Sequence, residues 1–272
     1  MNIPFMYAAL LLYFSGTISY WLYVYNKTEK LAFSSVALCC IGLILHTLSL
    51  CSRMIESGYF PLSKVYESIA FFSWALVIIS LVLGRWYKIY ALGAFILPVA
   101  AASLCGALLL PKGITPFDPL LHSNWFLIHT IFSVTGFVFF GISFSVGIMY
   151  LIQDRLLKQK RLTSFFYKLP PLNMLDDISM KVLSIGFFLL TIGIMAGLFW
   201  AKTAFGSISI TDTKMLFALL SWVFYLVIFH GRYSLGWRAK RGAFLSVLGF
   251  VLVMAAFAAT TCFSHNEWHA FF

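Results

Sequence analysis

Charged residues are scarce in this chain: they make up 10% of its 272 residues, and only nine are acidic. A soluble domain carries roughly 25% charged residues, so little of this surface is suited to water. No two carboxylates stand at paired spacing, which leaves acid–base hydrolysis unsupported. The five cysteines include no C-x-x-C pair, so thioredoxin-like exchange and a zinc knuckle are also unsupported. The cysteines are expected to be small apolar residues within helices.

Apolar residues, in contrast, are abundant: 61% of the chain is hydrophobic and the mean hydropathy is +0.92. A helix that crosses a bilayer needs about 20 mostly apolar residues, and alternating barrel patterning is absent. We therefore predict an all-α integral membrane protein, a single bundle of about eight transmembrane helices forming one domain over residues 1–272. Eight runs qualify, approximately 3–25, 31–51, 65–84, 89–110, 124–153, 180–201, 214–231 and 243–264.

The net charge of +10 does not indicate nucleic-acid binding, because the basic residues lie between apolar runs. With the N-terminus outside, 14 of the 19 lysines and arginines fall in inner loops and 5 in outer loops. Loops rich in these residues stay in the cytoplasm. We therefore expect both termini to face outside and the chain to lie in the inner (plasma) membrane. The first apolar run is interpreted as a first span and not as a cleaved signal peptide.

The longest inner loop is expected over residues 154–181, a basic stretch followed by Pro-Pro and then by Asp176 and Asp177. One interpretation places this loop on anionic lipids of the inner leaflet. The other treats it as an ordinary positively charged cytoplasmic tether. The sequence leaves both open.

Histidines are the candidate metal ligands, because ionisable groups in a membrane are a functional signal and imidazole suits iron, zinc and copper. On the expected topology His46 lies in the outer half of the second run and His230 at the inner end of the seventh. Each histidine can also be an interfacial or capping residue. Four lie at the outer side: His122, His129, His265 and His269. A pair of them from the fifth and eighth runs would be able to ligate one iron axially, with Trp125, Trp200 and Trp268 offering faces on which a porphyrin can stack.

A polar segment, "AKTAFGSISITDTK", separates the sixth and seventh runs. In it Asp212 is predicted to cap the helix that follows, and Glu67 is a candidate cap for the third run.

Several motifs together resemble the haem-handling membrane proteins of cytochrome c assembly, of the CcsA/CcmC type, and within them the HemX-like branch. These motifs are "SGYFPLSKVYESIAFFSW", "HSNWFLIHTIFS", "FYLVIFHGRYSLGWRAKRGAFLSVLGF" and "CFSHNEWHAFF", with a weaker match in "LHTLSLCSRM" around His46. The resemblance implies haem ligation by His129 and by His269, or His265, at the outer face. It also implies an intramembrane role for His230.

The same resemblance places a tryptophan-rich haem platform in this polar loop, where this chain has "FGSISITDTKM". Of that platform Gly206, Ser207, Asp212 and Lys214 remain. The tryptophan positions hold Phe205, Ser209 and Thr211, and Trp200 precedes the loop.

Three functions follow as hypotheses. The first is a haem carrier, not itself an enzyme, that binds haem and presents it at the outer face during cytochrome c assembly. Its attachment step would need a partner membrane subunit with thiol chemistry. The alternative is a HemX-like regulator that acts through residues 154–181 on a cytosolic enzyme of haem biosynthesis. A small-solute transporter is least favoured, because inverted repeats and broken helices are not visible.

Overall fold

The computed structural model describes residues 2–26, 28–113, 123–161, 164–206 and 213–263, and every regular element within them is an α-helix. The helices are α1 (Asn2–Asn26), α2 (Glu29–Ser57), α3 (Val65–Tyr87), α4 (Ala91–Leu109), α5 (Asn124–Lys158), α6 (Ser164–Lys168), α7 (Leu172–Phe205), α8 (Thr213–Ser234) and α9 (Ala239–Phe263). Eight of them, all except α6, are long and apolar enough to span a membrane. The predicted all-helical membrane fold is confirmed.

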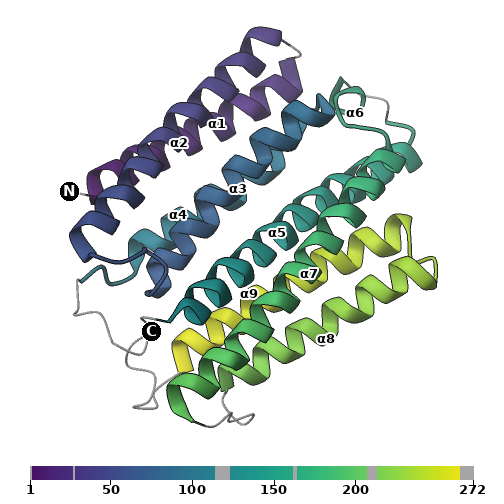
Figure 1. Cartoon of the computed structure of the whole chain (residues 1–272). Helices are drawn as coiled ribbons and strands as arrows, with labels where there is room; N and C mark the ends of the chain where they lie inside the picture. The colour runs from purple at the N-terminus through teal and green to yellow at the C-terminus, as the bar shows by residue number, and fades with distance from the viewer. Residues whose placement is uncertain (1, 27, 114–122, 162–163, 207–212, 264–272) are drawn as a thin grey trace.

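The long helices run up and down and form two groups that lie side by side (Figure 1). The first group holds α1 to α4, and the second holds α5, α7, α8 and α9. Helix α5 joins the groups, because it packs against α7 and α9 on one side and against α3 and α4 on the other. We call the end where α1 begins and α7 ends the N-terminal end, and the opposite end, where α5 ends, the basic end.

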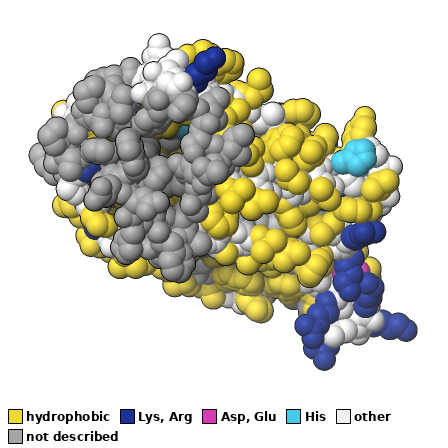
Figure 2. Space-filling model, turned by 90° about the horizontal axis from the view of Figure 1, so that it is seen from below, with side chains coloured by type: hydrophobic (Ala, Val, Ile, Leu, Met, Phe, Trp, Pro, Cys, Tyr) yellow, Lys and Arg dark blue, Asp and Glu magenta, His cyan; other side chains and the backbone are white. Residues whose placement is uncertain are grey.

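The surface of this bundle matches a hydrocarbon solvent. Large apolar side chains are exposed along the length of the helices, including Leu11, Phe33 and Trp86 at 68%, 78% and 78% exposure. One face of the molecule is largely hydrophobic, with lysine and arginine side chains gathered toward one end (Figure 2). In the lipid interior there is no water to hydrogen-bond the backbone, so each N–H and C=O group must find its partner within its own helix. This explains why no other regular structure occurs in the described residues.

The segment expected as a basic loop, residues 154–181, is mostly helical. Its first residues complete α5, its middle includes α6, and its last ten residues are the first turns of α7. Hydropathy marks only the apolar part of a helix, so the sequence did not reveal that α5 and α7 continue with polar residues beyond it. The cytoplasmic position of this segment stays a prediction.

Arg232 on α8 fixes the basic end of the second helix group. Its guanidinium donates to the carboxylate of Asp176 at 2.6 Å and to the hydroxyls of Ser179 and Ser246 at 3.1 and 3.4 Å. The Arg232 side chain is 1% exposed. Asp176, which the sequence placed in a loop, therefore holds α7 to α8, and Ser246 adds α9 to the same cluster.

Candidate functional site

His129 lies near the start of α5, at the N-terminal end. Helix α5 begins here because the Ser123 hydroxyl accepts a hydrogen bond from the Trp125 backbone N–H at 3.2 Å, a standard N-cap. Five residues into α5, the His129 ring is about 7.5 Å along the helix axis. Its Nδ1 lies 2.8 Å from the carbonyl oxygen of Gly193 on α7. A carbonyl only accepts, so Nδ1 carries the proton and Nε2 keeps the lone pair that binds metals.

Two glycines on α7 make room for this contact. A Cβ at Gly197 would lie 2.6 Å from His129 Nδ1, and a Cβ at Gly193 would overlap the Ser133 hydroxyl of α5. The spacing Gly-x-x-x-Gly puts both glycines on one face of α7, which lets two membrane helices approach closely. Gly193 and Gly197 are therefore a notch that receives the imidazole and fixes its orientation.

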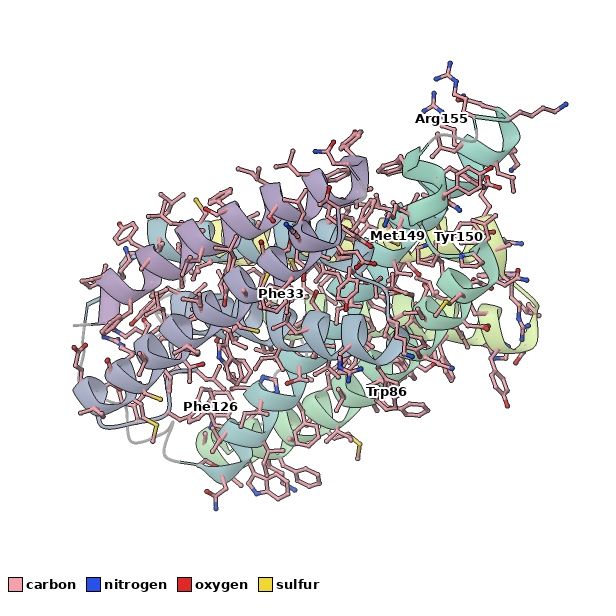
Figure 3. The ribbon with its side chains drawn as sticks, turned by 90° about the horizontal axis from the view of Figure 1, so that it is seen from above. Phe33, Trp86, Phe126, Met149, Tyr150 and Arg155 are labelled. Carbon is pink, nitrogen blue, oxygen red and sulfur yellow. The ribbon has the colours of Figure 1, made fainter. Side chains whose placement is uncertain are left out.

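Aromatic side chains surround the same end of α5 and α7. Trp125 stacks on Phe199 with ring centroids 5.1 Å apart and an interplanar angle of 27°. These rings are 42% and 52% exposed, so they offer a flat apolar face at the surface. Phe126, labelled at the start of α5 in Figure 3, meets Trp200 at 5.1 Å in a tilted arrangement. The surface suits a planar aromatic ligand, which prefers offset stacking on such rings.

A buried ion pair organises the neighbouring part of the N-terminal end. Arg53 on α2 donates to Glu67 on α3 at 2.8 Å, and the two side chains are 4% and 1% exposed. Glu67 also accepts from the backbone N–H groups of Ser63 and Lys64, which confirms its predicted capping role. Arg53 further donates to the carbonyls of Lys112 and Gly113. The pair thus anchors the chain that leaves α4.

The polar loop that follows α7 begins at Gly206. This residue has φ 71°, in the left-handed region, and its N–H donates to the carbonyl of Lys202. Only glycine adopts this conformation without strain, so Gly206 ends the helix. Phe205 is the last residue of α7 and α8 begins at Thr213. The other candidates of this region and of the tail lie outside the described residues: Ser207, Asp212, His122, His265 and His269.

The structure does not bring His230 or His46 to the His129 region. His230 is exposed near the basic end of α8, 17 residues and about 25 Å along the helix from Thr213. His46 is fully buried, and its Nδ1 lies 3.3 Å from the Tyr13 hydroxyl of α1. Within the described residues no group of three or more histidine, cysteine or acidic side chains is placed to hold a metal ion.

Sequence reasoning missed the roles of Gly193, Gly197 and Phe199, and it assigned no role to Arg53. The available signal was the Gly-x-x-x-Gly spacing in "TIGIMAGLFW", together with an arginine two residues beyond the second apolar run. Neither signal identifies its partner, because the partners lie on other helices.

An all-helical bundle with eight candidate spans and a lipid-compatible surface is a multi-pass membrane protein. Residues 62–264 match the family model described as "Cytochrome C assembly protein". This chain belongs to that cytochrome c assembly family.

Individual relatives agree with the family match. The chain is 33% identical over 259 residues to the cytochrome c biogenesis protein CcsA of Guillardia theta, covering 87% of this chain and 85% of the relative. It is 30% identical over 241 residues to CcsA of Prochlorococcus marinus, covering 79% and 76% of the two chains. Among solved structures, the cytochrome c heme lyase CcmF aligns with a TM-score of 0.63 at 14% identity. That alignment covers 96% of this chain but 46% of CcmF, so it shows a shared fold only.

Proposed function

We propose that this protein binds haem at the N-terminal end and presents it there during cytochrome c assembly. One observation supports this most strongly. The imidazole of His129 is held by the Gly193 carbonyl at 2.8 Å, in the one tautomer that keeps Nε2 available as an iron ligand. Membership of the cytochrome c assembly family gives that ligand its context.

In this proposal His129 supplies one axial ligand and His269, with His265 as the alternative, supplies the other from the chain after α9. The exposed rings of Trp125 and Phe199, which stack on each other, would pack against one face of the porphyrin. The proposal also assigns a part in haem binding to Trp200, Phe205, Gly206, Ser207 and Asp212. The protein would hold and orient haem, which is cargo here and not a resident cofactor.

His230 and His46 have different positions in this scheme. Exposed near the basic end of α8, His230 is suited to a first encounter with haem from the bilayer or the inner side. His46 is not part of the proposed site, because it is buried against α1. Attachment of haem to a cytochrome would need a partner membrane subunit, since this sequence has no C-x-x-C pair.

We also propose that the N-terminal end faces outside and that the protein resides in the inner (plasma) membrane. The described lysines and arginines support this orientation, because the basic end carries Arg155, Lys158, Lys160 and Arg161 at the end of α5. A reporter fused after residue 26 would then lie in the cytoplasm.

A HemX-like regulator of haem biosynthesis remains the second candidate. Two observations favour it: the platform tryptophans are replaced in this chain, and the basic end exposes Arg155 and Lys160 toward a cytosolic partner. In this case removal of residues 159–163 would change the level of the biosynthetic enzyme and leave cytochrome c maturation intact.

The absorption spectrum of the purified protein from a haem-replete host tests the first proposal. We expect a Soret band that His129→Ala and His269→Ala each shift or abolish, while His46→Ala leaves it unchanged. A wild-type protein without a Soret band, or a band that is insensitive to His129→Ala, would contradict the proposal.

A further inference from the structure

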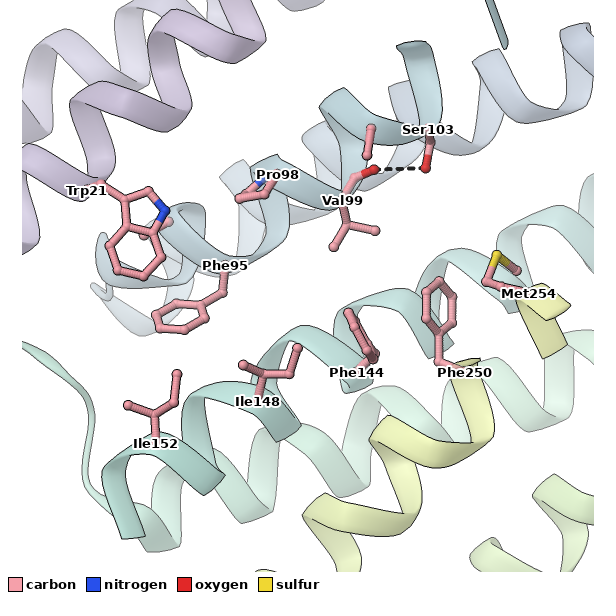
Figure 4. Close-up of a pocket in the computed structure, with 12 residues that line it drawn as sticks. Trp21, Phe95, Pro98, Val99, Ser103, Phe144, Ile148, Ile152, Phe250 and Met254 are labelled. Carbon is pink, nitrogen blue, oxygen red and sulfur yellow. Dashed lines mark hydrogen bonds between the residues drawn. The ribbon is translucent and has the colours of Figure 1, made fainter. Parts of the chain in front are cut away.

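The surface between the two helix groups carries an apolar groove of about 610 Å³. Its walls come from α1, α4, α5 and α9 (Figure 4). Along α4 it runs from Ala94 to Ser103, nine steps or about 13.5 Å of helix. One leaflet of hydrocarbon is about 15 Å deep, so the groove has the length of one acyl chain in a single leaflet.

The lining excludes a polar or metal-bound occupant. Ser103 is the one hydroxyl among the lining residues, and it already donates to the Val99 carbonyl at 2.8 Å (Figure 4). No histidine or charged side chain is among the residues that line it. The groove volume falls in the range of roughly 300–1,000 Å³ that small-molecule sites occupy. A flexible hydrocarbon chain fits such walls, whereas the iron of a porphyrin would find no ligand among the lining residues.

A basic residue follows the α5 wall of this groove. Ile148 and Ile152 line it on α5, and Arg155 follows on the same face of that helix, three residues beyond Ile152. Arg155 is exposed and extends from the tip of α5 (Figure 3). In the described part of the chain no carboxylate lies within ion-pair distance of it.

A second cation comes from α6. Phe165 of α6 stacks on Trp21, a lining residue, with centroids 6.2 Å apart and an interplanar angle of 5°. One turn later, Lys168 places its ammonium 4.5 Å from the ring of Tyr23 and 3.4 Å from its hydroxyl. Among the described residues it too has no carboxylate partner. Thus α6 lies beside one wall of the groove through Phe165, and Lys168 lies close by, against a residue two positions beyond Trp21 on α1.

We propose that this groove is a binding site for an anionic phospholipid. One acyl chain lies between α4 and α5, and the phosphate group is bound by Arg155 and Lys168 at the basic end. The argument is charge complementarity. An apolar groove of about one-leaflet length lies beside two basic residues, Arg155 beyond its α5 wall and Lys168 on the helix that stacks on Trp21, and within the described residues neither has a carboxylate partner. Such an arrangement suits an anionic headgroup. The site is independent of the haem proposal.

Titration of the delipidated full-length protein in mild detergent tests this site, with phosphatidylglycerol and phosphatidylcholine of identical chains as probes. Bound lipid is counted by native mass spectrometry. A basic residue near an anionic headgroup contributes about fivefold in affinity (about 1 kcal/mol), so we expect phosphatidylglycerol to bind about 25-fold more tightly. Arg155→Gln with Lys168→Gln should remove this preference. Arg85→Gln with Lys88→Gln, exposed charges at the same end of α3, should keep it.

The groove itself is tested by filling it. Ala102 lines the groove and is exposed, so Ala102→Phe enters open space and should lower the affinity for both lipids at least tenfold. Ala255→Phe, an exposed alanine on α9 outside the lining, is the matched control. Equal binding of the two lipids to the wild type would overturn the proposal. So would unchanged binding by Ala102→Phe, competition by inorganic phosphate alone, or displacement of the lipid by haem.

Discussion

Gly197→Ala places one methyl group against the ring of His129. The new Cβ would lie 2.6 Å from Nδ1, whereas ordinary contacts begin at 3.4 Å. The ring must therefore move by about 0.8 Å, which stretches the 2.8 Å bond to the Gly193 carbonyl to about 3.6 Å and breaks it. His129 then loses the contact that fixes its tautomer and orientation.

The stability cost of this change is small, because two effects oppose each other. Loss of the hydrogen bond costs about 1 kcal/mol, and alanine stabilises a helix interior by about 1 kcal/mol relative to glycine. Loss of a partner that orients a metal-ligating histidine typically costs 10–100-fold in affinity. We therefore expect haem binding to fall 10–100-fold while the thermal midpoint changes little.

The assay is a haem titration of the purified protein, followed at the Soret band, with thermal unfolding measured in parallel. Gly106→Ala on α4 is the matched control, since no atom lies within 4 Å of a Cβ at that glycine. It should bind haem as the wild type does. Wild-type affinity in Gly197→Ala would refute the claim that the notch positions His129, and a large loss of stability would show that the notch serves packing instead.

Three further predictions concern the bundle. Glu67→Ala leaves the buried Arg53 without its carboxylate and should destabilise the protein by about 3–5 kcal/mol, seen as a lower thermal midpoint. Asp176→Asn weakens the pair with the buried Arg232 at the basic end and should lower the midpoint without altering the haem spectrum; an altered spectrum would contradict the separation of the two ends. Trp125→Ala removes a 42%-exposed ring and should weaken haem binding with little change in stability, so an unchanged titration would exclude this ring from the site.

The amino-acid sequence by itself determined the class of protein and the number of spans. Whether a helix is stable in lipid is a local property. Each run of about 20 apolar residues forms all its backbone hydrogen bonds within its own helix and partitions into lipid without contact to another helix. For the same reason the cap at Glu67, which pairs with residues three and four positions away, was predictable.

Only the tertiary structure decided which helices pair and what each polar group contacts. The His129 ring and the Gly193 carbonyl are 64 residues apart, and Arg232 and Asp176 are 56 apart. Apolar sequence carries little information about such pairings, because lipid solvates every apolar face almost equally well and the choice depends on close packing at small residues. The groove between the two helix groups has the same origin, since its walls come from four helices that no local pattern connects.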